Sequence, residues 1–254
     1  MLERLLGKRR GQQPAAPPRV PEGSRVYAIG DVHGRADLLR EMHQLIHEDA
    51  YARQAPRNVV VYLGDYVDRG PASAEVIDIL LDEPLPGFES VHLAGNHEDT
   101  LIRFLSDTSI AGLWLEYGGE ATLYSYGVKP PGVTETELLR VQDELRERIP
   151  PRHVSFMRGL KLTHCEGDWF FVHAGVKPGV PLEAQLPKDA LWIRSEFLGC
   201  NDDFGKIIVH GHTVTEAPEV RRNRIGIDTG AFMSGCLTCL VLEAERWSFL
   251  QTRS

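Results

Sequence analysis

The residues best suited to chemistry are aspartates, histidines and one asparagine that stand directly after short apolar runs. A single aspartate or histidine in such a place is usually a helix cap or a turn residue. Here the pattern recurs at five successive run ends, which stability alone does not require, so it indicates a binding site. The residues concerned are Asp31, His33, Asp65, Asn96, His97, His173, His210 and His212.

This set of carboxylate, amide and imidazole groups without cysteine suits borderline to hard divalent cations. Manganese is the first choice, with iron and zinc also compatible. The candidates are too many for one ion, whereas two ions that share a carboxylate fit their number. Two metals roughly 3.5–4 Å apart can clamp a phosphoryl group and activate a water for in-line attack. We therefore expect two divalent metal ions and phosphoryl chemistry.

The apolar runs that carry these residues predict strands of an α/β fold. The first three runs each alternate with a segment of helical spacing, which is typical of parallel strands. Ligands of open α/β sheets bind at the carboxyl ends of strands, where the polar residues fall. Strands are predicted over 25–29, 58–63, 90–94, 168–172, 206–209, 224–228, 235–242 and 246–251, and helices over 36–52, 72–81 and 99–106.

Two segments differ from this alternation. Residues 108–160 predict a helical insert over one side of the site, in which Thr134 and Glu137 form a capping box and Pro150 ends a helix. Residues 1–23 contain a stretch rich in Pro, Ala and Gln and predict a flexible leader. The remainder, 24–254, is expected to form a single domain.

Composition narrows the functional classes. The formal net charge of −8 argues against nucleic acid as a partner. No apolar run approaches the roughly 20 residues that span a bilayer, and the basic first residues lack the apolar stretch of a secretory signal. The four cysteines, including the Cys236–Cys239 pair, are interpreted as structural thiols in a reducing compartment. A cytoplasmic protein without membrane contact is expected, and its oligomeric state stays open.

Five sequence motifs resemble those of the phosphoprotein phosphatases, a family of calcineurin-like metallophosphoesterases. The resemblance covers Arg25 to about Asp228 and is closest to the bacterial and phage-like branch. It implies a four-layer αββα sandwich of two mixed sheets. The motifs are Gly-Asp-Val-His-Gly at 30–34, Gly-Asp-Tyr-Val-Asp-Arg-Gly at 64–70, Gly-Asn-His-Glu at 95–98, Val-His-Ala-Gly at 172–175 and His-Gly-His-Thr at 210–213.

The resemblance also implies a role for each matching residue. Asp31 and His33 would hold the first metal, and Asp65 would bridge both. Asn96, His173 and His212 would hold the second. His97 would act as the general acid, oriented by Asp68, while Arg69, Arg194 and Asn96 would bind the substrate phosphate. Glu98 would support the site without touching metal. His210 is interpreted as structural, although a metal-binding role stays open.

The implied activity is that of a metal-dependent phosphomonoesterase, in the first place a protein serine/threonine phosphatase that acts on phosphorylated proteins or peptides. Attack would come from a hydroxide that bridges the two metals. One alternative is a dinucleoside tetraphosphate hydrolase with the same metals, which Asp68, Arg69 and Glu98 disfavour. A catalytically inactive module that binds phosphoproteins is remote, because no ligand is missing. A nucleic-acid phosphodiesterase is disfavoured by the acidic balance.

Overall fold

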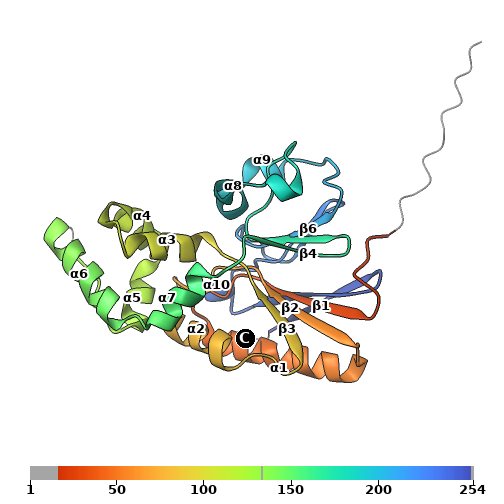
Figure 1. Cartoon of the computed structure of the whole chain (residues 1–254), viewed down its shortest axis with the longest axis horizontal. Coiled ribbons are helices and arrows are strands. Elements are labelled where there is room, and N and C mark those ends of the chain that lie inside the picture. The colour runs from red at the N-terminus through yellow and green to blue at the C-terminus, as the bar shows by residue number, and fades with distance from the viewer. Residues whose placement is uncertain (1–16, 133, 253–254) are drawn as a thin grey trace, which may run out of the picture.

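The computed structural model describes residues 17–132 and 134–252, whose strands form two sheets of five (Figure 1). The first sheet has the order β10-β9-β1-β2-β3. Its strands β1 to β3 run parallel, because α1 (Ala36–Arg53) and α2 (Ser73–Asp82) return the chain between them, whereas β9 runs antiparallel to β1. The strands are β1 (Ser24–Ile29), β2 (Arg57–Tyr62), β3 (Phe88–His92), β9 (Thr238–Glu243) and β10 (Arg246–Gln251).

The second sheet has the order β4-β5-β6-β8-β7 and is also mixed. Its parallel strands are β5, β6 and β8, and an antiparallel strand flanks them at each edge. Strands β4 and β7 are absent from the sequence-based prediction, because both are short and only partly buried. The strands are β4 (Thr163–Glu166), β5 (Trp169–Val172), β6 (Ile207–His210), β7 (Glu219–Val220) and β8 (Arg224–Gly226).

Alternate side chains of the central strands explain the layers. On β1, Val26 and Ala28 face the second sheet, where they pack with residues such as Trp169 and Phe171 of β5. Tyr27 and Ile29 point the other way, onto α1 and α2. The outer face of the second sheet packs against α8 (Pro187–Trp192) and α9 (Ser195–Leu198). The expected αββα sandwich is thus confirmed (Figure 1).

A separate group of helices lies beside the sheets (Figure 1). It follows α3 (Asn96–Phe104), and Thr134 with Glu137 forms the capping box of α6. Trp114 and Phe104 pack their rings against each other, which joins the group to α3. Its members are η1 (Thr108–Ile110), α4 (Ala111–Glu116), α5 (Gly119–Ser125), α6 (Glu135–Arg148) and α7 (Pro151–Arg158).

Several boundaries differ from the sequence-based prediction by a few residues: β9 begins at Thr238 rather than Gly235, and β8 ends at Gly226 rather than Asp228. Two further differences have a clear cause. Helix α3 begins at Asn96 rather than Asp99, because Glu98 folds back to accept the N–H of Gly95. Packed structure also begins before Ser24: Val20 is buried, and its N–H donates to the carbonyl of Ala244. Residues 17–23 therefore belong in part to the domain, while the rest of the expected leader, 1–16, lies outside the described residues.

None of the helices in the described ranges combines the length and the apolar character that crossing a bilayer requires. Two further short elements complete this part of the chain: η2 (Leu182–Ala184) and α10 (Ala231–Ser234).

A buried histidine, His43, and a partly buried one, His92, lie beside Tyr62 and predict that acid destabilises the fold. His92 stacks on the Tyr62 ring, and the Tyr62 hydroxyl lies 2.8 Å from Nε2 of His43. Burial lowers the pKa of each imidazole to about 4. Below the unfolded pKa of about 6.5 the unfolded chain therefore binds more protons, and stability falls as pH decreases from there towards 4.

Each histidine should account for about 2 kcal/mol of the stability lost between pH 7 and pH 5. His92→Phe, which can still stack on Tyr62, should reduce that loss by this amount in urea unfolding of metal-free protein. Exposed His47→Gln serves as the control. An unchanged pH dependence in His92→Phe would contradict the expectation.

Candidate metal centre

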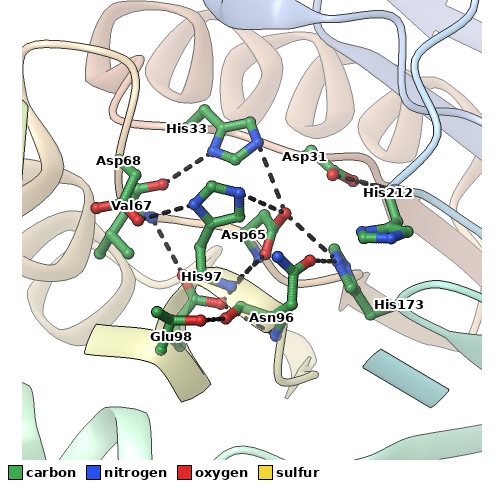
Figure 2. Close-up of polar contacts among 12 residues, drawn as sticks. Asp31, His33, Asp65, Val67, Asp68, Asn96, His97, Glu98, His173 and His212 are labelled. Carbon is green, nitrogen blue, oxygen red and sulfur yellow. Dashed lines mark hydrogen bonds and ion pairs between the residues drawn. The ribbon is translucent and has the colours of Figure 1, made fainter. Parts of the chain in front are cut away.

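Five strand ends bring the predicted residues to one edge of the sandwich. Asp65 lies at the centre of the group, and the rings of His33, His97 and His173 all point toward its carboxylate (Figure 2). Oδ2 of Asp65 lies 3.6 Å from Nε2 of His33, 3.8 Å from that of His97 and 3.3 Å from that of His173. Residues as far apart in the chain as Asp31 and His212, which are separated by 181 positions, thus meet at this edge, where the carboxyl ends of strands from both sheets lie.

Backbone carbonyls set the orientation of two imidazoles. Nδ1 of His33 lies 2.9 Å from the carbonyl oxygen of Val67, and Nδ1 of His173 lies 2.9 Å from that of Leu63. A carbonyl can only accept, so Nδ1 carries the proton in both rings. In His33, whose pKa burial lowers to about 3, Nε2 is then left with a lone pair directed toward Asp65, which is the usual arrangement of a histidine that binds metal. Nε2 of His173 lies 2.9 Å from Oδ1 of Asn96 and 3.3 Å from Oδ2 of Asp65. Burial lowers the pKa of His173, but Asp65 outweighs it and raises that pKa to about 9, so Nε2 donates to these acceptors.

The donor atoms form two sets that share Asp65. One comprises His33, Asp65 and His97, and the other Asp65, His173 and His212, with the ligand atoms of each set within 4.8 Å of one another. Nε2 of His33 and Nε2 of His212 are buried without a hydrogen-bond partner. Buried polar atoms without partners are uncommon and are explained well by an ion. The residues therefore fit two cations with Asp65 between them.

Two glycines leave the room that these side chains need. A Cβ on Gly95 would overlap Oδ1 of Asp65, and a Cβ on Gly211 would overlap Oδ1 of Asp31. The backbone N–H of His212 can therefore approach Asp31, whose Oδ2 accepts from it at 3.0 Å. This contact places Asp31, which belongs to neither donor set, beside the strand end that supplies His212.

Backbone strain is concentrated at the same place. Among the described residues, seven that are not glycine have a positive φ. Such conformations cost on the order of 1–3 kcal/mol each and collect at functional sites. Five of the seven belong to the predicted site: His33, Asp65, Asp68, Arg69 and His212.

Burial and neighbouring charge act oppositely on the acidic residues. Burial would raise the pKa of Asp65, but His173 and His97 outweigh it and hold that pKa well below its usual range. The pKa of Asp31 is raised well above its usual range by burial and by the nearby Asp228. A cation bound between these carboxylates would relieve their repulsion.

The insert holds the predicted general acid through Asp68. Nδ1 of His97 lies 2.8 Å from Oδ2 of Asp68. Thr122 of α5 donates to Oδ1 of Asp68 at 2.6 Å, and the indole N–H of Trp114 in α4 donates at 3.1 Å. Burial opposes protonation of His97, but Asp65 and Asp68 outweigh it and raise its pKa. Sequence reasoning missed Trp114 and Thr122, because no motif surrounds either residue.

Glu98 lies beside the ligands without joining their sets. Its carboxylate accepts the backbone N–H groups of Asp65 at 2.9 Å, Tyr66 at 2.7 Å and Val67 at 3.1 Å. It therefore fixes the loop on which Asp65 lies, which is the supporting position that the sequence predicts.

The two predicted phosphate-binding arginines lie at different depths. Arg69 is partly buried, and its guanidinium carbon lies 4.8 Å from the centre of the Phe232 ring. Arg194 is exposed, and its Nη1 donates to Oγ1 of Thr213 at 3.3 Å, next to His212. Arg69 thus lies on the side of His33, which also packs on Phe232, and Arg194 lies on the side of His212.

His210 does not join the metal ligands in the structure. Its Nδ1 contacts the carbonyl oxygen of Gly211 at 3.1 Å, and its ring packs on Phe197 at 5.1 Å. It lines a small cavity of about 170 Å³ with Arg224 and Glu219, away from Asp65. This position agrees with a structural role.

The sequence of this chain matches the family model "Calcineurin-like phosphoesterase" over residues 24–230. The chain belongs to the calcineurin-like phosphoesterase family. The match contains every residue of the two donor sets described above. Members of this family use a dimetal centre, and the donor sets around Asp65 supply the residues that would hold it.

Curated relatives of this calcineurin-like phosphoesterase include two proteins named bis(5'-nucleosyl)-tetraphosphatase PrpE [asymmetrical]. The one from Bacillus cereus is 27% identical over 229 residues and aligns with 84% of this chain and 88% of its own. The one from Geobacillus thermodenitrificans is 27% identical over 233 residues with the same coverage.

Solved structures share the fold. A proposed diadenosine tetraphosphatase is 17% identical, with a TM-score of 0.60 over 95% of this chain and 97% of that one. A cold-active protein tyrosine phosphatase is 17% identical, with a TM-score of 0.59 over 91% of this chain and 81% of that one. At these identities the comparison establishes the architecture alone.

The residues present can carry out phosphoester hydrolysis. Two ions bound at Asp65 would supply Lewis-acid stabilisation of the phosphoryl group and an activated water. Arg69 and Arg194 can orient the phosphate through charge-assisted hydrogen bonds. His97 can hold a proton at Nε2 for the leaving oxygen, because Asp68 occupies its Nδ1.

Proposed function

We propose that this phosphoesterase hydrolyses dinucleoside tetraphosphates asymmetrically, to a nucleoside monophosphate and a nucleoside triphosphate, with manganese as its metal. The observation that carries the proposal is the similarity to the bis(5'-nucleosyl)-tetraphosphatases, which extends over 84% of the chain. This function is the alternative that the sequence motifs disfavour. Protein serine/threonine phosphatase activity, their first choice, has weaker support and is the second candidate.

The motif residues do not distinguish the two reactions. Arg69 would bind the phosphoryl group and His97, which Asp68 holds, would protonate the leaving oxygen, and both substrates present these groups. The difference between the substrates lies beyond the leaving oxygen, where one carries a serine or threonine and the other a polyphosphate with a nucleoside. Specificity therefore depends on the rim of the site.

Aromatic side chains at this rim support the nucleotide. The Tyr117 ring lies 6.0 Å from that of His97, and the Trp192 ring lies 6.4 Å from that of His212. The two rings lie 6.0 Å from each other, and both are only partly buried. Stacking of a base on an aromatic side chain contributes about 1–3 kcal/mol. Tyr117 and Trp192 thus offer a nucleobase a surface beside the metal centre.

The test compares kcat/KM for diadenosine tetraphosphate with that for a phosphoserine or phosphothreonine peptide. Metal-stripped protein is reconstituted with manganese, and the products are separated by chromatography. Faster release of AMP and ATP is the expected result. Faster turnover of the peptide would favour the second candidate, whereas two equivalents of ADP would exclude the asymmetrical reaction.

Trp192→Leu should raise KM for diadenosine tetraphosphate about tenfold, by loss of base stacking. KM for free phosphoserine, which has no base, should change little. Trp247→Leu, at a partly exposed indole on β10, is the matched control. Equal effects of Trp192→Leu on both substrates would contradict the stacking role.

A further inference from the structure

Asp228 lies at the metal centre but belongs to none of the motifs that identify the ligands. It follows β8 by two residues, at the same sheet edge as the ends of β5 and β6, because these three strands run parallel. Its side chain is 2% exposed. A carboxylate is seldom buried to this degree unless it is paired or binds a metal.

Only one of the two oxygens of Asp228 has a partner. Oδ1 accepts the backbone N–H of Gly230 at 2.9 Å, which closes a local turn. Oδ2 is buried and has no hydrogen-bond partner. The turn therefore accounts for one oxygen and leaves the other unexplained.

The same property marks two of the predicted ligands. Nε2 of His33 and Nε2 of His212 are likewise buried without a partner. Four more such atoms among the described residues belong to Asn58, Trp169, His210 and Arg224, so it is the place of these ligands beside Asp65 that points to an ion. Leaving a charged acceptor buried and unsatisfied costs more than the roughly 1–3 kcal/mol of a neutral group. Cations at this centre would satisfy these atoms, and no hydrogen-bond donor among the described residues does so for Oδ2.

The charges around Asp228 also favour a cation. Burial raises the pKa of Asp31 most, and the nearby carboxylate of Asp228 is the next largest cause of that rise. The pKa of Asp228 is itself raised, chiefly by burial, with Asp65 adding to the effect, while His173 and Arg69 oppose it. Three buried carboxylates thus lie together, and neither Asp31 nor Asp228 has an ion pair among the described residues.

We propose that Asp228 is a further carboxylate of the metal centre, whose Oδ2 adds to the oxygens around the cation held by Asp31. This role does not depend on which phosphoester is cleaved, and it goes beyond the proposed function. The competing explanation is that Asp228 serves only the turn at Gly230.

The two explanations differ for Asp228→Asn. Its Oδ1 can still accept from Gly230, so the turn is kept, while the charge at Oδ2 is lost. If Asp228 binds the cation, manganese affinity measured by isothermal titration should fall about 10–100-fold, the range found when residues that support a metal site are replaced. Without metal, Asp228→Asn should melt at a higher temperature than the wild type, because one repelling carboxylate is gone.

Glu216→Gln is the matched control, because it removes one negative charge from an exposed side chain on the same stretch of chain after β6. It should change neither the affinity nor the melting temperature. Asp228→Ser, whose hydroxyl can also accept from Gly230, provides a second test if Asp228→Asn does not fold. Unchanged manganese affinity in Asp228→Asn would overturn the proposal. So would a melting temperature of the metal-free variant below that of the wild type, combined with the same rise in melting temperature on adding manganese as in the wild type.

Discussion

Asp65→Asn is expected to reduce kcat by about 10³-fold or more. Asp65 is common to both donor sets, and Oδ2 lies within 3.8 Å of three imidazole nitrogens. An amide keeps the size of the side chain and removes the charge that both cations share. Lewis-acid stabilisation is worth several kcal/mol, and each 1.4 kcal/mol corresponds to a factor of ten in rate.

Metal analysis of the purified variant should show fewer than two ions per chain. Circular dichroism would establish that the variant is folded, and Asp202→Asn at an exposed position is the control. Full metal content in Asp65→Asn would mean that Asp65 is not the shared ligand.

His97→Asn should reduce kcat by about 10²–10⁴-fold, the usual contribution of a general acid. The structure allows two roles for Nε2 of His97, because the atom belongs to a donor set and its Nδ1 is held by Asp68. Metal content separates them. If His97 is the acid, the variant keeps two ions per chain, and loss of an ion would show that His97 is a ligand.

The size of this effect should also depend on the leaving group. A serine alkoxide leaves poorly without a proton, whereas a nucleoside triphosphate is already a stable anion. We therefore expect His97→Asn to reduce kcat more for a phosphoserine peptide than for diadenosine tetraphosphate. For diadenosine tetraphosphate the reduction should be close to about 10²-fold. Equal losses for both substrates would indicate that His97 acts by positioning the phosphate rather than by protonating the leaving oxygen.

The ligand residues could be predicted from the sequence because each directly follows an apolar strand. Parallel strands of one sheet end at the same edge, so Asp31 and Asp65, which follow neighbouring strands, were expected to lie together. His173 follows β5 of the other sheet, so its place beside them depends on how the two sheets pack. The four-layer sandwich followed from the resemblance carried by the same motifs. Local patterns therefore determined both the fold and the ions' immediate surroundings.

The surroundings of these ligands could not be predicted in the same way. Trp114 and Thr122 reach Asp68 across 46 and 54 positions of the chain, and nothing in their local sequence marks them. Asp228 also lacks a motif, and only its buried, unpartnered oxygen reveals it. Contacts of this kind depend on how the insert and the second sheet pack, which periodicity does not specify.

The substrate could not be predicted from the motifs, because the residues that would distinguish a nucleotide from a peptide lie outside them. In the predicted roles Arg69 would bind the phosphoryl group, Asp68 would hold His97 and Glu98 would hold the loop of Asp65, so all three are compatible with either leaving group. Tyr117 and Trp192, which distinguish a nucleotide from a peptide in our proposal, lie on separate elements and meet only in the folded protein. The relatives, rather than the motifs, therefore favour the nucleotide.

Titration of manganese into metal-stripped protein, with AMP and ATP release from diadenosine tetraphosphate followed at each step, tests the central claim most directly. We expect no turnover without metal and a rate that reaches its plateau at two bound ions per chain, with equal amounts of the two products. Turnover by the metal-free protein, or no hydrolysis with two ions bound, would contradict the assignment of this chain as a dimetal dinucleoside tetraphosphate hydrolase.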